Sequence, residues 1–144
     1  MNLPLRSALY LLSLAASAAS LAAGDLILGV NGQTRHQVLV PDSMPDERLG
    51  KSVMAAADLM REAFAAQGID LPVAKESEKD PERHGIYLGA TAFAKDHGVD
   101  VATLPGATFV HKVIGKDLII AGRDADEPLS RRGLKIEQGT LFSV

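Results

Sequence analysis

One long amphipathic helix, with short β-prone segments before and after it, restricts this chain to folds in which a helix packs against a sheet. From about Asp46 to Gln67 the apolar residues recur at steps of three and four, so they share one side of a helix. That apolar stripe consists of Leu49, Val53, Ala56, Ala57, Met60, Ala63 and Phe64. Gly68 is typical of the residue after a helix end, and we expect the helix to stop there.

The segments around this helix are typical of short β-strands. Asp25–Val30 and Gln37–Val40 precede it, and the tight-turn signal Asn31–Gly32 between them predicts a hairpin or two neighbouring strands. The elements predicted after the helix are an extended piece at Ile69–Val73, strands at Gly85–Leu88, Thr108–Ile114 and Asp117–Ala121, and a short helix at Ala92–Asp96. Gly115–Lys116 predicts a hairpin turn between the last two strands.

The predicted element order is therefore ββ-α-β-β-α-ββ. Helices and strands alternate in part of the chain, and at least one hairpin interrupts the alternation. This combination indicates an α+β (α/β-like) fold, with a mixed β-sheet and two main helices packed on it.

The first 24 residues differ from the rest of the chain. Arg6 is their only charge, an apolar run follows over Ala8–Leu14, and small residues continue to Gly24. This pattern is typical of a secretory signal peptide. A membrane anchor is the alternative, but the strongly apolar core is shorter than the ~20 residues that a span needs. We expect cleavage after Ala23 or Gly24, a secreted or periplasmic location without later membrane association, and one domain over residues 25–144.

Composition excludes several classes of function. The 144 residues carry a net charge of −3, and aromatic residues make up 4%. A nucleic-acid binder needs a basic face and aromatic side chains for stacking, so no nucleic-acid partner is expected. The absence of cysteine excludes thiolate zinc sites, thiol catalysis and disulfide bonds.

The histidines do not predict a metal site or a cofactor. His36, His84, His97 and His111 include no pair at the i, i+4 spacing of a helical metal site, and no HExxH motif occurs. Tyr87–Thr91 reads as a strand, a glycine turn and a helix start, which is a geometry that can hold an anion. Without a glycine-rich phosphate motif, a plain turn capped by Thr91 is the better interpretation.

Charged clusters offer few candidates for chemistry. Lys75–His84 mixes both signs of charge, and we expect a solvated loop there. Asp124, Asp126 and Glu127 follow the last predicted strand, where paired carboxylates could act as acid and base on a glycosidic bond, although an exposed loop is the commoner outcome. We assign no catalytic residue. Arg123 and Asp124 are the candidates for a contact with a ligand or with a neighbouring domain.

Five short motifs together resemble a known family. They are AAADLMREAF (Ala55–Phe64), GIDLPV (Gly68–Val73), IYLG (Ile86–Gly89), IIAGRD (Ile119–Asp124) and GTLFSV (Gly139–Val144). Their order and spacing resemble the N-terminal domain of secreted bacterial glycoside hydrolases, as found before the catalytic barrel in family 67 alpha-glucuronidases and family 20 beta-hexosaminidases. The resemblance spans the chain from Asp25 to Val144.

The resemblance implies a non-catalytic accessory domain. In such proteins GTLFSV would lead into a (β/α)₈ barrel that carries the catalytic carboxylates, so the expected partner is a C-terminal barrel in the same chain, and this chain is a fragment that is not expected to be an enzyme alone. The first alternative is a free-standing exported module that binds a carbohydrate or another small ligand. The second alternative is a small hydrolase that uses Asp124, Asp126 and Glu127.

Overall fold

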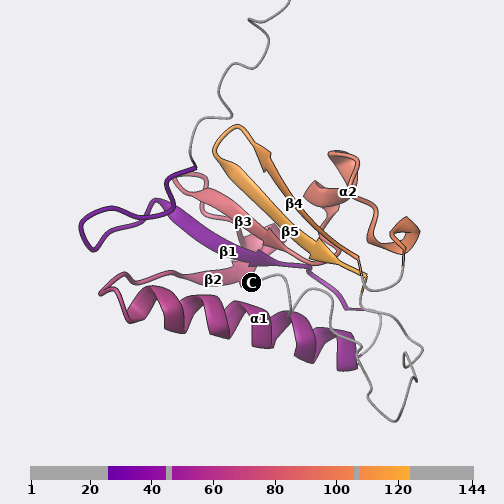
Figure 1. The fold of residues 1–144 in the computed structure, drawn as a ribbon, viewed down its shortest axis with the longest axis horizontal. Helices are drawn as coiled ribbons and strands as arrows, with labels where there is room; N and C mark the ends of the chain where they lie inside the picture. The colour runs from indigo at the N-terminus through magenta and orange to yellow at the C-terminus, as the bar shows by residue number, and fades with distance from the viewer. Residues whose placement is uncertain (1–25, 45–46, 106–107, 124–144) are drawn as a thin grey trace, which may run out of the picture.

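A five-stranded mixed sheet forms the centre of the protein in this computed structural model, which describes residues 26–44, 47–105 and 108–123 (Figure 1). The elements are β1 (His36–Val40), α1 (Glu47–Ala65), β2 (Val73–Lys75), β3 (His84–Leu88), α2 (Ala92–Asp96), β4 (Phe109–Ile114) and β5 (Asp117–Gly122), with 3₁₀ turns η1 (Glu76–Glu78) and η2 (Val101–Thr103). The strand order is β2-β1-β3-β5-β4. Strands β2, β1, β3 and β5 run parallel, and β4 pairs antiparallel with β5 at one edge. The predicted fold class is confirmed.

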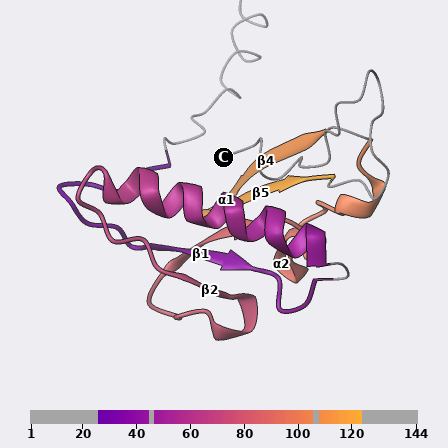
Figure 2. The same ribbon diagram turned by 90° about the horizontal axis from the view of Figure 1, so that it is seen from below.

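The two helices pack on opposite faces of this sheet. Alternate strand residues point to opposite faces, so Val38 and Ile86 pack with Val53 of α1, while Leu39 and Tyr87 pack with Ala94 of α2. Figure 2 shows α1 lying along its side of the sheet, with α2 beyond it. The result is three layers with a hydrophobic cluster on each side of the sheet.

Helix α1 forms where the apolar stripe predicts it. Val53, Ala56 and Ala57 are buried in the sheet contact, whereas Ala63 is exposed. At the C-terminal end the Ile69 N–H donates to Phe64 O at 3.0 Å, and the Gly68 N–H donates to Ala65 O at 2.9 Å. These are the two bonds of a Schellman motif, which requires the positive φ of 74° that Gly68 adopts.

The predicted strand before the Asn31–Gly32 turn does not form. Leu26–Gly29 is not a strand, and Val30 makes only an isolated bridge with Gln33. Asn31 and Gly32 have φ values of 52° and 76°, as a two-residue type I′ turn requires. Strand β1 is paired with β2 on one side and with β3 on the other, so neither of its edges is free for a further strand.

The charged stretch Lys75–His84 is more than the solvated loop that its composition predicts. The Glu76 carboxylate accepts hydrogen bonds from the backbone N–H groups of Ala92 and Phe93, at 2.8 and 2.7 Å. The Gln37 amide donates to Asp80 O at 2.9 Å. The stretch therefore ties the start of α2 and strand β1 to the loop between β2 and β3.

Candidate functional site

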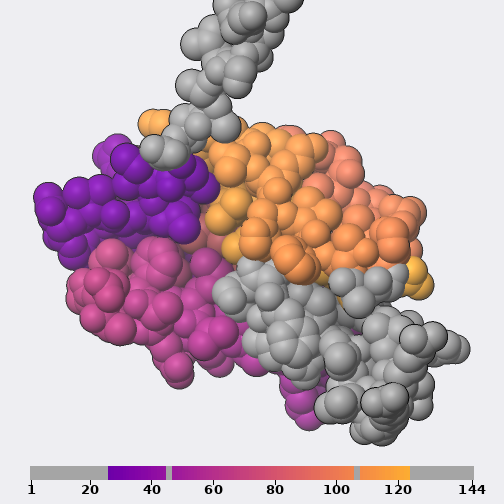
Figure 3. Space-filling model, in the orientation of Figure 1, coloured from indigo at the N-terminus to yellow at the C-terminus, as the bar shows by residue number. Residues whose placement is uncertain are grey.

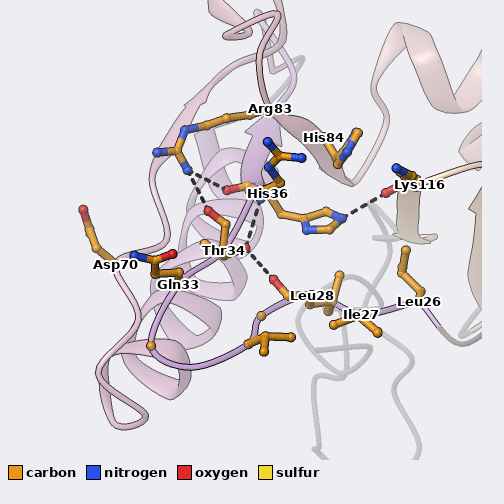
Figure 4. Close-up of a pocket in the computed structure, with 14 residues that line it drawn as sticks. Leu26, Ile27, Leu28, Gln33, Thr34, His36, Asp70, Arg83, His84 and Lys116 are labelled. Carbon is orange, nitrogen blue, oxygen red and sulfur yellow. Dashed lines mark hydrogen bonds between the residues drawn. The ribbon is translucent and has the colours of Figure 1, made fainter.

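A cavity of about 770 Å³ lies at the amino-terminal ends of the parallel strands β1, β3 and β5 (Figure 4). This volume falls in the range of small-molecule sites. The walls come from four parts of the chain: the segment before β1, Asp70 between α1 and β2, the residues at the start of β3, and the turn between β4 and β5. The lining residues are Leu26, Ile27, Leu28, Gly29, Val30, Gly32, Gln33, Thr34, Arg35, His36, Asp70, Arg83, His84 and Lys116.

The segment before β1 folds back to form one wall of the cavity. The Thr34 hydroxyl donates a hydrogen bond to Leu28 O and accepts one from the His36 N–H at 3.0 Å. Arg83 donates from Nη1 to Thr34 O at 3.4 Å and to His36 O at 3.3 Å. One side chain from the start of β3 therefore holds the entry into β1 in place (Figure 4).

His36 is buried in the wall of this cavity, with 3% of its surface exposed. Its Nε2 lies 2.9 Å from the backbone oxygen of Lys116. A carbonyl oxygen only accepts, so Nε2 carries the proton and donates. Among the described residues, nothing hydrogen-bonds to the buried Nδ1. Such an orphaned buried polar atom is uncommon in folded proteins.

His84 lies beside His36. The two residues are register partners on the neighbouring parallel strands β3 and β1, and their ring centroids are 5.3 Å apart. Burial lowers the pKa of His84 below its usual value of 6.5, and the neighbouring His36, Lys116 and Arg35 lower it further. Asp117 opposes this shift. The imidazole is therefore surrounded by more positive than negative charge.

Positive side chains dominate the polar lining of the cavity. Arg35, Arg83 and Lys116 contribute three cations, and Asp70 contributes a carboxylate. The nearby Asp117 carboxylate accepts a hydrogen bond from the Gly85 N–H at 2.6 Å. This arrangement can hold an anion, whereas a single lining carboxylate does not form the acid and base pair that glycoside hydrolysis uses.

A second hollow, of about 440 Å³, lies between α1 and the β4–β5 hairpin. Its lining is almost entirely apolar and consists of Leu28, Leu59, Met60, Ala63, Phe64, His111, Leu118 and Ile120. We call this hollow the apolar groove. Figure 3 shows the β4–β5 hairpin and the segment before β1 meeting on one face of the molecule.

Neither Arg123 nor Thr91 lines the cavity of about 770 Å³, which we call the basic cavity. Arg123 follows β5, and its Nη1 donates to Leu104 O at 3.0 Å. Asp124, Asp126 and Glu127 lie outside the described residues, so their predicted roles stay predictions. Thr91 caps α2 as predicted, because its hydroxyl accepts from the Ala94 N–H at 3.2 Å.

The sequence interpretation missed the meeting of His36 and His84. The two residues are 48 positions apart, and only the parallel register of β1 and β3 brings them together. One weak signal could have found them, since each histidine lies between an arginine and the first residue of a predicted strand. The described residues contain no group of three or more metal-ligating side chains. No described helix is both long and apolar enough to cross a membrane.

No family model matches this chain, and comparison with the curated proteins and with the solved structures finds no significant match.

Proposed function

We propose that this chain is a non-catalytic accessory domain of an exported carbohydrate-active enzyme, and that the catalytic domain packs against its apolar groove. The observation that carries the proposal is the exposure of large apolar side chains around this groove. Leu59 of α1 is 47% exposed, and Phe109 and Val113 of β4 are 53% and 49% exposed. Of these three, Leu59 lines the groove itself, and exposed apolar surface beside such a hollow is typical of an interaction site.

The groove exists because α1 covers only part of its face of the sheet. The helix packs on β1 and β3, and the β4–β5 hairpin extends beyond it. In the hairpin register Val113 pairs with Leu118 and His111 pairs with Ile120, so these residues share the face that lines the groove. A second layer over this half of the sheet would bury them.

The occupant that fits this position is a domain later in the same chain. Strand β5 supplies Leu118 and Ile120 to the groove, and the chain continues from the end of that strand. A following domain would therefore be tethered beside the groove, which raises its effective concentration there. The five motifs that resemble glycoside hydrolase N-terminal domains support a catalytic barrel as that domain.

The gene beyond the codon for Val144 tests this proposal. Several hundred in-frame codons with alternating strand and helix patterns are the expected result. A stop codon in an intact locus, with no barrel encoded nearby, would contradict the proposal.

A free-standing exported binding module is the second candidate function, and the basic cavity favours it. The aromatic platform that many sugar binders use is not available at Tyr87, which is 3% exposed and stacks on Phe93 with centroids 4.0 Å apart. Calorimetry with neutral oligosaccharides tests this candidate. Saturable binding by the purified protein would favour it over the accessory role.

A further inference from the structure

Three cationic side chains from separate parts of the chain line the basic cavity. Arg35 ends the segment before β1, Arg83 precedes β3, and Lys116 lies in the β4–β5 turn. Like charges gathered in one place repel each other, and a bound anion removes that repulsion. The cavity also lies apart from the apolar groove, since Leu28 is the one lining residue that both include.

Two of these cations are available to a ligand. No other described residue forms a hydrogen bond or ion pair with Lys116 Nζ or with the Arg35 guanidinium. Arg83 has a different role, because its Nη1 binds two backbone oxygens and its Nε lies 3.6 Å from the Asp80 carboxylate. Arg83 therefore contributes charge and shape to the wall.

The buried imidazole of His36 forms part of the cavity wall. Its Nε2 donates to Lys116 O, and its Nδ1 has no hydrogen-bond partner among the described residues. Because Nδ1 is buried, His36 contributes to the shape of the wall, and a ligand does not contact this atom. Leu26, Ile27 and Leu28 form an apolar side of the same cavity, which suits the carbon skeleton of a small molecule (Figure 4).

We propose that this cavity binds a small organic molecule through an oxyanion, either a carboxylate or a phosphate, which Lys116, Arg35 and His84 contact. Charge-assisted hydrogen bonds from these groups would hold the oxyanion. Because the three groups come from separate parts of the chain, they would also fix its position. This proposal is independent of the apolar groove.

The protonation of His84 supplies a direct readout. Burial, His36, Lys116 and Arg35 lower its pKa in the protein without ligand, and Asp117 is the acidic group that opposes them. A bound anion favours the charged imidazolium, so binding should raise the pKa of His84. Binding should also strengthen as the pH falls toward 6.

Isothermal titration calorimetry with the purified protein tests the proposal, with inorganic phosphate, gluconate and neutral glucose as the probes. Phosphate or gluconate should bind with one-site saturation, and glucose should not. Binding of only one of the two anions identifies the source of the oxyanion. Lys116→Gln and Arg35→Gln should each weaken the affinity for the anion by about tenfold, because each removes one charge-assisted contact.

Matched controls separate the cavity from general surface charge. Lys51→Gln and Arg61→Gln remove the same types of cation from the exposed surface of α1, and affinity should stay unchanged. An NMR titration of His84 should give a higher pKa with the anion than without it. The proposal is overturned if neither anion binds, if Lys116→Gln and Arg35→Gln bind as tightly as the controls, or if the His84 titration does not move. A charge placed in the groove by Leu59→Glu should leave anion binding unchanged, which keeps this test separate from the proposed accessory role.

Discussion

His36 and His84 lie side by side on neighbouring parallel strands, with ring centroids 5.3 Å apart. The His36 ring hydrogen-bonds to the backbone of the β4–β5 turn at Lys116, so this pair links the starts of β1, β3 and β5. Protonation of the His84 ring adds charge beside Lys116 and Arg35, and burial together with these neighbours lowers the pKa of His84. His84 therefore makes the stability of this end of the sheet depend on pH.

Acidification should destabilise the protein through His84. Its pKa in the folded state lies below 6.5, the value expected for the unfolded chain, so the unfolded state binds more protons between the two values. Stability should fall as the pH is lowered through about 6.5 toward the folded-state pKa of His84. Urea unfolding midpoints between pH 7.5 and pH 5 measure the effect.

His84→Gln should flatten that dependence. The Asp42 carboxyl should not contribute to the change of stability between pH 7.5 and pH 5. Hydrogen bonds from Ser77 lower its pKa below 3.8, so its stabilising contribution is lost only at more acidic pH. Equal pH slopes in His84→Gln and the parent protein would contradict the assignment.

Gly85→Ala should destabilise the protein because no space exists for a side chain beside Tyr87. A Cβ at position 85 would lie 2.7 Å from Tyr87 Cζ, and the Tyr87 ring is fixed by stacking on Phe93. Overpacking of this kind costs about 1–3 kcal/mol, measured by urea denaturation. Gly50→Ala is the control, since its Cβ would meet only the flexible Met44 side chain, at 3.3 Å, and should be neutral or stabilising. Similar losses at both positions would show that steric conflict at Tyr87 is not the cause.

Glu76→Ala should destabilise α2 by about 1 kcal/mol, because it removes the acceptor for two N–H groups at the helix start. Thermal unfolding measures the loss. Glu82→Ala, in the same loop, removes an exposed carboxylate that does not cap a helix and should have little effect. A Glu76→Ala protein as stable as Glu82→Ala would show that the cap contributes nothing.

Local patterns in the sequence predict most of the elements. The period of the apolar residues predicts α1, and Gly68 predicts its end. The Gly115–Lys116 turn predicts the β4–β5 hairpin, where Gly115 has a φ of 63°. Local patterns do not predict the order of the strands in the sheet, because pairing between residues far apart in the sequence determines that order. For the same reason Leu26–Gly29 is β-prone in sequence but finds no free strand edge to pair with.

Local patterns in the sequence do not predict the candidate site. They point instead to Tyr87–Thr91, where a strand turns into a helix start, and to Arg123 and Asp124, in a charged cluster after a strand. The basic cavity lies where strands β1 and β3 begin, at His36 and His84. The register that joins these two residues follows from sheet pairing, and no periodicity in either segment encodes it.

The apolar groove should bind a hydrophobic dye. The exposed Leu59, Phe109 and Val113 side chains predict fluorescence of bound 8-anilinonaphthalene-1-sulfonate in the purified protein. Leu59→Glu should reduce the signal severalfold, because Leu59 lines the groove. Met54→Glu is the matched control, because Met54 is 41% exposed on α1 but does not line the groove. Equal dye binding in both variants would mean that the groove is not the apolar surface that the dye detects.

Association with the proposed catalytic domain is the most direct test of the accessory role. Sedimentation velocity of the purified protein, mixed with the barrel domain that we propose follows it in the gene, should detect a 1:1 complex. Leu59→Glu should weaken that complex by at least about tenfold, because it places a charge in a desolvated contact, and Met54→Glu should not weaken it. A barrel that does not associate, or a complex that is equally strong with Leu59→Glu, would contradict the proposal that this chain is a docking accessory domain.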